Sequence, residues 1–476
     1  MHKCGICGVC SPASNELTYK MLLQLQHRGQ LSAGITAYRP NEPFILYTHK
    51  NLGLVNKVFY AETKEKFQAV MEKTSCEKSI GHVRYATCGV DDIHYAQPFE
   101  HLHGKKNRWF SLCFNGNIAN YPSLKKSLEK ENYHFIRATD TEAILLLLAK
   151  QIKEQRTITE AFAKLSPKLD GAYNIAFIDA EGTIVAVRDP LGFRPLCYAE
   201  KEGKFAFASE SVALQSIGFD EIKDLEPGCM LVHSGGVLKK ERFAKSPRVA
   251  HCFFEWVYFA HAASTMDGKN VYNVRYALGK KLAEVEKEKI DENCVVVAVP
   301  DSSTPAGNSF ANQLKIPFRE GLIRNRYVGR TFIESKDRSE KVASKFTLIK
   351  EVFDGKKVFL VEDSIVRGTT LKNLVAFIKK HGNPKEIHVR VSCPQIKWPC
   401  FYGIDMSTKK ELIASEKSDE EIAKEIGANS VNYQTIEGLL KAFDIDKNKL
   451  CLACLNGEYP TKAGEARKND KHYCRE

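Results

Sequence analysis

The sequence of 476 residues contains no apolar run that reaches the roughly 18 residues needed to cross a bilayer. Its first residues also lack the apolar segment of a secretory leader. These absences argue against a helical membrane protein, and we expect a cytoplasmic one. Internal repeats and low-complexity segments are missing too, so the chain is predicted to fold throughout, and its length predicts two or three domains.

Charge of one sign is not concentrated anywhere in the chain. The formal net charge is +12, but Lys and Arg are spread along the sequence and form no basic block. Nucleic acid is therefore not the favoured partner, and a phosphorylated small substrate fits the charge equally well. The fifteen cysteines are an odd number in a long chain, which favours reduced thiols, some of them as ligands or nucleophiles.

The first half of the chain has the pattern of a strand-rich domain. Short alternating apolar runs such as Ala172–Ile178 and Thr183–Val187 are separated by Gly, Asn and Pro turns and predict strands. The apolar segment Thr141–Gln151 follows polar capping residues and predicts a buried helix. We therefore expect an α+β arrangement here.

The pattern changes from about Val271 onwards. Helical segments now alternate with short and wholly apolar runs, Val295–Val299, Val358–Val361 and Ile387–Val391. Such runs are typical of parallel strands that are covered on both faces. The second half is thus predicted to be a doubly wound α/β domain. The boundary is expected between Val237 and Phe253, where the Lys-rich stretch Lys239–Arg248 contains a Ser-Pro pair.

The most informative run of the second half is Val358–Thr370. A buried strand ends in two carboxylates, Glu362 and Asp363, and a Ser/Gly/Thr loop leads into a helix predicted to begin near Leu371. Backbone N–H groups at a helix N-terminus bind phosphate, and paired carboxylates at a strand end can hold ribose hydroxyls or magnesium. A plain strand-to-helix turn with a capping Asp would need no second acid.

This run resembles the phosphoribosyl pyrophosphate (PRPP) signature of type I phosphoribosyltransferases. The resemblance implies that Glu362 and Asp363 contact the ribose hydroxyls and, with Ser302, a magnesium ion. Pro300–Pro305 resembles the pyrophosphate loop of that family, and Arg324–Phe332 resembles a lid, although a solvated basic loop is the alternative for the second segment. The further residues implied at PRPP are Ser364, Arg367, Gly368, Thr369 and Thr370 at the 5-phosphate and Arg326 and Arg330 in the lid, beyond which Arg338 and Lys345 also lie.

Five short motifs of the first half resemble class II glutamine amidotransferases, which are N-terminal-nucleophile hydrolases with an αββα sandwich. They are Cys4–Ile6, Gln26–Gln30, Gly81–Thr87, Asn115–Asn117 and Thr139–Glu142. The resemblance implies that residues 1–3 are removed, so that the mature chain begins at the cysteine. A free α-amino group has a pKa near 8 and can act as the base for a thiol, whereas an amide nitrogen cannot.

The same resemblance implies a role for each residue of the glutamine site. Cys4 attacks the side-chain amide of glutamine, and Asn115 with the Gly116 N–H forms the oxyanion hole. Arg84 and Asp140 pair with the α-carboxylate and α-amino groups of the substrate. An ordinary structural ion pair is the alternative for these last two. The CxxCxxC spacing of Cys4, Cys7 and Cys10 would by itself favour an iron-sulfur cluster, but no Cys-Pro follows in the ferredoxin pattern.

The combination of both motif sets resembles the amidophosphoribosyltransferase family from Cys4 to Thr461. That family makes 5-phosphoribosylamine and pyrophosphate from glutamine and PRPP, the first committed step of purine biosynthesis. The resemblance implies a leader at residues 1–3, a glutaminase domain at 4–245 and a phosphoribosyltransferase domain at 246–476. It also implies feedback inhibition by purine nucleotides and a homotetramer.

One branch of the family binds a 4Fe-4S cluster through four cysteines that match Cys252, Cys400, Cys451 and Cys454 here. Buried free thiols and a zinc site are the alternatives. Cys393 is a possible substitute ligand. The resemblance to this branch therefore implies two cofactors, Mg²⁺ and the cluster, the latter in a structural role.

The chain departs from the family pattern at four places, namely Leu31, Ser303, Glu362 and His261–Ala263. The last of these, where Arg-Pro-Asp is expected, leads us to expect altered coupling between the sites. Two other functions stay open. One is transfer to another amine or base, and the other is a non-catalytic protein that binds PRPP.

Overall fold

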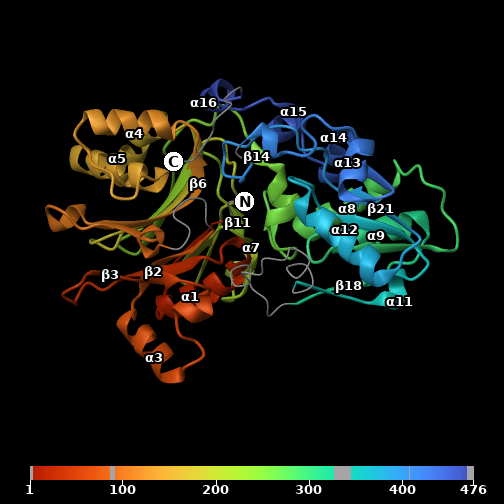
Figure 1. Ribbon diagram of the computed structural model, residues 1–476. Helices are drawn as coiled ribbons and strands as arrows, with labels where there is room; N and C mark the ends of the chain where they lie inside the picture. Colours follow the sequence, from red (N-terminus) through yellow and green to blue (C-terminus); the bar gives the residue numbers. More distant parts are fainter. Residues whose placement is uncertain (1–3, 86–91, 326–344, 407, 469–476) are drawn as a thin grey trace.

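The computed structural model describes residues 4–85, 92–325, 345–406 and 408–468. The first half contains two stacked antiparallel sheets (Figure 1). In order across the first sheet, its strands are β11 (Lys223–Asp224), β9 (Cys197–Lys201), β10 (Lys204–Ala208), β1 (Gly5–Cys10), β4 (Lys78–Arg84), β2 (Ser32–Tyr38) and β3 (Leu46–Leu52). In order across the second, they are β13 (Val237–Arg242), β12 (Cys229–Ser234), β8 (Ile184–Arg188), β7 (Gly171–Asp179), β6 (Phe110–Ile118) and β5 (Phe99–His101).

An apolar core between the two sheets holds this half together. Alternate residues of β1 and β4, such as Ile6 and Ile80, meet Ala176 and Ala186 of the second sheet, and all four are fully buried. Helices cover the outer faces: α1 (Ser14–Gln24), α3 (Lys64–Lys73) and α7 (Ser211–Gln215) on the first sheet, and α4 (Tyr121–Lys130), α5 (Asp140–Glu154) and α6 (Ile158–Leu165) on the second. This is the predicted αββα sandwich.

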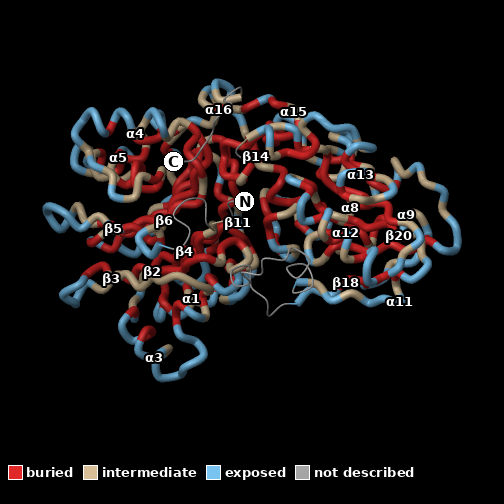
Figure 2. Tube along the Cα trace, viewed as in Figure 1, coloured by how far each residue is buried: buried red, intermediate tan, exposed pale blue. Residues whose placement is uncertain are grey.

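The second half contains the predicted parallel sheet. Its strands run in the order β17 (Cys294–Ala298), β20 (Lys357–Glu362), β21 (Glu386–Val391) and β22 (Ser430–Tyr433). Val295 and Val297 face one core and Val296 faces another, so both sides of the sheet are buried. The helices that pack here are α8 (Val271–Ala283), α9 (Thr304–Leu314), α12 (Thr369–Gly382), α13 (Asp419–Ile426) and α14 (Ile436–Phe443). The doubly wound domain is thereby confirmed, and Figure 2 shows the buried positions concentrated in its strands.

The Lys-rich stretch before the second half is partly a strand. Its first part belongs to β13, which pairs with β12 at the edge of the six-stranded sheet. Lys239 and Lys240 of this strand are exposed. Lysines suit an edge strand because they discourage pairing with another chain. A Lys-rich composition is therefore compatible with a strand at this position.

The last part of the chain packs back against the first half. The short strand β23 (Leu450–Cys451) pairs in parallel with β14 (His251–Cys252). The backbone N–H of Ala463, on α16 (Lys462–Ala466), donates to Asp170 at 3.0 Å. Asn117 Nδ2 donates to the Phe401 carbonyl at 2.7 Å. The two halves are thus joined by hydrogen bonds across their interface.

In the described parts of the chain, no helix is long and apolar enough to cross a membrane.

Candidate functional site

The first candidate centre lies around Cys4, which precedes β1 at the junction of the two halves. Because Gly5 pairs with Val83 across the sheet, Cys4 lies beside Arg84 and Tyr85. Burial raises the pKa of the Cys4 thiol, while a hydrogen bond from the Tyr85 backbone and the charge of Arg84 act in the opposite direction. The net effect keeps the thiol protonated at neutral pH, so an attack by this sulfur needs a base.

Asn115 and Gly116 lie on β6, in the sheet that packs against β1. Asn115 is buried, and its Nδ2 has no hydrogen-bond partner. A buried amide donor without a partner costs free energy, which is typical of a group that serves a ligand. A Cβ on Gly116 would lie 2.0 Å from the Ala172 carbonyl oxygen, so only glycine allows the two strands to pair this closely.

Asp140 is the first residue of α5 and lies near enough to Cys4 to influence the pKa of its thiol. The preceding loop is held by Glu142, whose carboxylate accepts the backbone N–H groups of Ile136, Arg137 and Ala138 at 2.7–2.9 Å. Thr139 caps the helix by accepting the Glu142 N–H at 3.2 Å. The motif Thr139–Glu142 thus fixes the helix start that presents Asp140.

The alternative cluster at Cys4, Cys7 and Cys10 does not form. Cys7 and Cys10 lie three residues apart on β1, so their side chains point to opposite faces. Cys7 packs in the core beneath α1, and Cys10 packs between the two sheets. Both are buried.

The second candidate centre lies at the carboxyl ends of β17 and β20. Ser302 Oγ donates to Asp363 at 2.5 Å, and Ser303 Oγ donates to Glu362 at 3.2 Å. Ser364 Oγ also donates to Asp363, at 2.5 Å. Burial, together with the charge of Asp363, raises the pKa of Glu362 well above its usual value. A positive ligand or a hydroxyl donor would relieve this repulsion.

The loop after Asp363 enters α12 as predicted, but the helix begins at Thr369, two residues earlier than expected. Gly368 has a φ of 75°, and a Cβ there would lie 2.4 Å from Ile413 Cδ1. Thr369 and Thr370 form the first turn of the helix, where backbone N–H groups are free of helical partners. Arg367 is directed elsewhere, since Nε donates to Glu411 at 2.7 Å. Arg326 and Arg330 of the predicted lid lie outside the described residues, as does Arg338.

The four cysteines of the implied cluster come from three distant segments and meet near the interface. Cys252 and Cys451 are direct partners in the β14–β23 pairing. The thiol of Cys454 is an electrostatic neighbour of Cys252, Cys400 and Cys451, and burial raises its pKa. Cys393 also neighbours Cys454. Among the residues described, no group of three His, Cys, Asp or Glu side chains could hold a metal ion as placed.

Four residues of the interface had no role in the sequence interpretation. Arg28, Glu210, Glu255 and Arg194 form a fully buried ion cluster next to Cys4. Arg28 belongs to one of the recognised motifs, but its partners are 182 and 227 residues away. Such pairings leave no signal in a single sequence.

The departure at His261–Ala263 adjoins this cluster. The His261 backbone N–H donates to Glu210 at 2.8 Å, and its ring lies 5.7 Å from that of His27. His27 Nε2 lies 2.8 Å from Glu210. The unusual residue therefore lies at the contact between the halves.

Comparison with known proteins assigns each half of the chain to a domain family. Residues 82–216 match the family model described as a glutamine amidotransferase domain, and residues 269–412 match a phosphoribosyl transferase domain. An amidophosphoribosyltransferase of Methanothermobacter thermautotrophicus is 41% identical over 466 residues, which cover 96% of this chain and 94% of that protein. The Bacillus subtilis amidophosphoribosyltransferase is 38% identical, over 97% and 94% of the two chains.

A solved structure shares the whole architecture. Glutamine PRPP amidotransferase from B. subtilis, complexed with ADP and GMP, has a TM-score of 0.85 at 36% identity and covers 96% of this chain and 98% of its own. A structure titled as the allosteric regulatory enzyme of purine biosynthesis has a TM-score of 0.87, with 98% and 97% of the chains covered. With relatives of this identity along nearly its full length, the chain belongs to the amidophosphoribosyltransferase family.

Proposed function

We propose that the chain performs the family's glutamine-dependent amidophosphoribosyl transfer with Cys4 as nucleophile and Asp363 and Glu362 at the PRPP ribose. The observation that carries this assignment is the buried and unpartnered Nδ2 of Asn115 in the centre around Cys4. A donor held without a partner is suited to an oxyanion that exists only during the reaction.

The first half-reaction releases ammonia. The Cys4 sulfur attacks the amide carbon of glutamine, and the α-amino group of a mature chain that begins at Cys4 takes the thiol proton. Asn115 Nδ2 and the Gly116 N–H stabilise the oxyanion, while Arg84 and Asp140 hold the α-carboxylate and α-ammonium groups. Ammonia leaves with the transferred proton, and water then hydrolyses the thioester to glutamate.

The second half-reaction forms the carbon–nitrogen bond. Ammonia attacks the anomeric carbon of PRPP and pyrophosphate leaves, giving 5-phosphoribosylamine. Glu362 and Asp363 hold the ribose hydroxyls, and the loop with Ser364, Gly368, Thr369 and Thr370 binds the 5-phosphate. The oxygen donors of Ser302, Glu362 and Asp363 suit Mg²⁺, which when bound would neutralise pyrophosphate charge.

Isotope transfer tests this assignment. Purified protein receives PRPP, Mg²⁺ and glutamine labelled with ¹⁵N in its side-chain amide. Glutamate, pyrophosphate and ¹⁵N-phosphoribosylamine are expected in equal amounts. If no product carries ¹⁵N and the protein instead joins another amine or a base to PRPP, the alternative transferase is favoured. If the protein binds PRPP without any turnover, the non-catalytic function is favoured.

The mature N-terminus is a separate part of the proposal. Intact-mass measurement on active protein is expected to show a chain that starts at Cys4. Full glutamine-dependent activity with Met1 retained would contradict the amine-base mechanism.

The cysteine set at the interface fits a 4Fe-4S cluster by its chemistry. The thiols of Cys252, Cys400, Cys451 and Cys454 are mutual electrostatic neighbours, and a cluster spreads its ligands wider than a single ion does. Anaerobically purified protein is expected to be brown, with about four irons and four sulfides per chain. Cys451→Ser should lose the colour and the stability of the docked C-terminal segment. Zinc alone, or a colourless protein of full stability, would overturn the cluster.

Four further expectations belong to the proposal. We place the domain junction after residue 245, since the six-stranded sheet ends at Arg242 and β14 already pairs with the C-terminal β23. We propose purine nucleotides as inhibitors because the B. subtilis neighbour was solved with ADP and GMP. The homotetramer and the cytoplasmic location stay predictions.

A further inference from the structure

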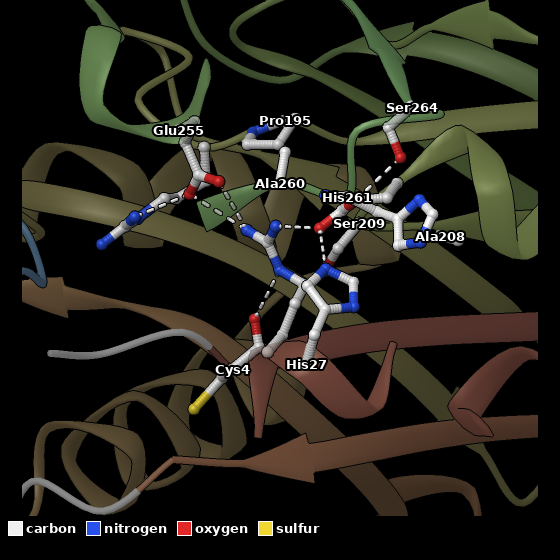
Figure 3. A network of polar contacts seen from close by, with 12 residues as sticks. Cys4, His27, Pro195, Ala208, Ser209, Glu255, Ala260, His261 and Ser264 are labelled. Carbon is white, nitrogen blue, oxygen red and sulfur yellow. Dashed lines mark hydrogen bonds and ion pairs between the residues drawn. The ribbon is translucent and has the colours of Figure 1, made fainter. Parts of the chain in front are cut away.

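The buried ion cluster joins the two halves directly beside the proposed nucleophile. Arg28 and Glu210 are completely buried, and the side chains of Glu255 and Arg194 are 1% and 2% exposed. Figure 3 shows Cys4 and His27 on one side of this network and Glu255, Ala260 and His261 on the other. The Cys4 carbonyl oxygen faces the network, whereas its sulfur points away from it (Figure 3).

Arg28 is the only member that reaches the main chain of Cys4 in this network. Its Nε donates to the Cys4 carbonyl at 3.3 Å. Its Nη1 is paired with Glu210, and its Nη2 donates to the Glu255 carboxylate at 2.8 Å. A guanidinium group is a planar and rigid fork, so three partners fix its position and orientation. The location of the Cys4 main chain therefore depends on both carboxylates.

The two carboxylates have different origins. Glu210 follows β10 of the first half. Glu255 comes just after β14, at the start of the second half. Glu255 is also bound by Arg194 Nη1 at 2.7 Å. Arg194 in turn donates to the Tyr402 carbonyl at 3.1 Å and has Cys252 and Cys400 as electrostatic neighbours. One acid thus links the nucleophile to the second half and to the cysteine set.

A second connection leads toward the PRPP centre. Glu210 accepts the His261 backbone N–H at 2.8 Å and the Ser264 hydroxyl at 2.7 Å. Arg275 of α8 donates to the Ala260 carbonyl at 2.8 Å. Burial lowers the pKa of the Arg275 guanidinium to about 10, and the charges of Asp363 and Glu210 act in the opposite direction. The segment 255–264 therefore contacts Arg28 and Glu210 directly and is connected to the PRPP centre through Arg275.

We propose that Arg28 is a positioning residue for Cys4 and that Glu255, supplied by the second half, holds it in place. The inference rests on the proposed function, because it concerns the geometry of the same thiol. Glutamine use then requires the docked arrangement of the halves, whereas ammonia use does not. Neither Arg28 nor Glu255 touches a reacting atom.

Glu255→Gln is the decisive variant because it keeps the size of the side chain and removes the charge that holds Arg28 and Arg194. The glutamine-dependent kcat is expected to fall about 10²-fold, since small misplacements of a nucleophile cost that much. The KM for glutamine and the ammonia-dependent rate should stay close to those of the unsubstituted protein. Glu255→Asp should restore part of the glutamine-dependent rate.

Glu286→Gln is the matched control. Glu286 forms an equally buried pair with Arg390, at side-chain exposures of 3% and 2%, and lies in the second half away from Cys4. This variant should lower the melting temperature and leave the ratio of glutamine-dependent to ammonia-dependent rates unchanged. A double variant, Glu255→Gln with Arg194→Gln, should regain stability because it removes the unpaired cation, but its ratio should stay low.

Alkylation of Cys4 gives a readout that needs no turnover. Mature protein is treated with iodoacetamide, and modification of Cys4 is followed by peptide mass spectrometry. The rate should fall in Glu255→Gln and not in Glu286→Gln. Equal losses of glutamine-dependent and ammonia-dependent activity, or an unchanged alkylation rate, would overturn the positioning role. Failure of the unsubstituted protein to make phosphoribosylamine would instead refute the proposed function, and the alkylation contrast would still decide the inference.

Discussion

The two centres differ in how their polar groups are partnered within the protein. Asn115 Nδ2 is buried without a partner in the centre around Cys4. At the PRPP centre, Asp363 and Glu362 already accept hydrogen bonds from Ser302, Ser303 and Ser364. Under the proposed function, the first centre would be preorganised for a charge that develops in the reaction, and the second would exchange internal hydrogen bonds for bonds to ligand.

The centres also differ in how they are assembled. Most of the PRPP centre comes from one run at the end of β20 and from one loop at the end of the neighbouring β17. The Cys4 centre needs β4, β6 and the start of α5 to converge on the strand that follows the cysteine. Its geometry is consequently more sensitive to the packing of distant segments.

Separate removal of each centre should have the largest effect. Cys4→Ala is expected to reduce glutamine-dependent synthesis about 10³-fold or more, because the nucleophile is lost, and to leave ammonia-dependent synthesis intact. Asp363→Asn should remove synthesis with both nitrogen sources. Rates with glutamine and with ammonium salts are measured side by side. Loss of both activities in a folded Cys4→Ala protein would show that the centres are not separable.

Asn115→Ala tests whether the unpartnered amide serves the reaction. The glutamine-dependent kcat should fall about 10²–10³-fold, as expected for one oxyanion donor. Thermal stability should change little, because Nδ2 makes no hydrogen bond that the variant could lose. A clear loss of stability with little change in kcat would assign Asn115 to the fold.

His82 should make the stability of the first half fall as the pH is lowered. Burial lowers the pKa of His82 to about 3, whereas an unfolded histidine titrates near 6.5. Above pH 6.5 the imidazole is neutral in both states and has no effect. Between about 6.5 and 3 the unfolded chain binds one more proton, so stability falls by about 1.4 kcal/mol per pH unit.

His82→Gln should remove the contribution of one proton from the pH dependence of stability, because glutamine does not titrate. The new amide can still donate to the Phe114 carbonyl, which lies 3.2 Å from His82 Nε2. Urea unfolding followed between pH 5 and 7, in steps of about half a unit, measures the difference. An unchanged slope would mean that His82 is protonated in the folded protein.

Ser303→Ala is expected to have the smallest effect and tests the hydrogen bonds at the PRPP centre. Glu362 would lose the hydroxyl that donates to it at 3.2 Å, at a cost of about 1 kcal/mol in the free energy of unfolding. Saturating PRPP with Mg²⁺ should reduce this difference, because the ligand supplies replacement partners. A difference that stays the same with ligand would argue against exchange of hydrogen bonds at this centre.

Two segments show which structural features the sequence left ambiguous. The Lys-rich stretch gave no sign of a strand, yet β13 continues to Arg242 because an edge strand tolerates lysines. The CxxCxxC spacing kept a cluster open until β1 placed Cys7 and Cys10 on opposite faces. In both places local composition was ambiguous, and pairing with another strand decided the outcome.

The sequence by itself determined the two fold classes, the run Val358–Thr370 and the order of the amidotransferase motifs. The strands and the parallel sheet follow from periodicity, which a single sequence displays. The αββα sandwich and the motif order follow from resemblance of short segments to known families. The tertiary structure alone decided that Asn115 Nδ2 lacks a partner and that Arg28 joins Cys4 to Glu255. Such contacts join residues up to 227 positions apart, and they exist only because burial brings charges together that must then be paired.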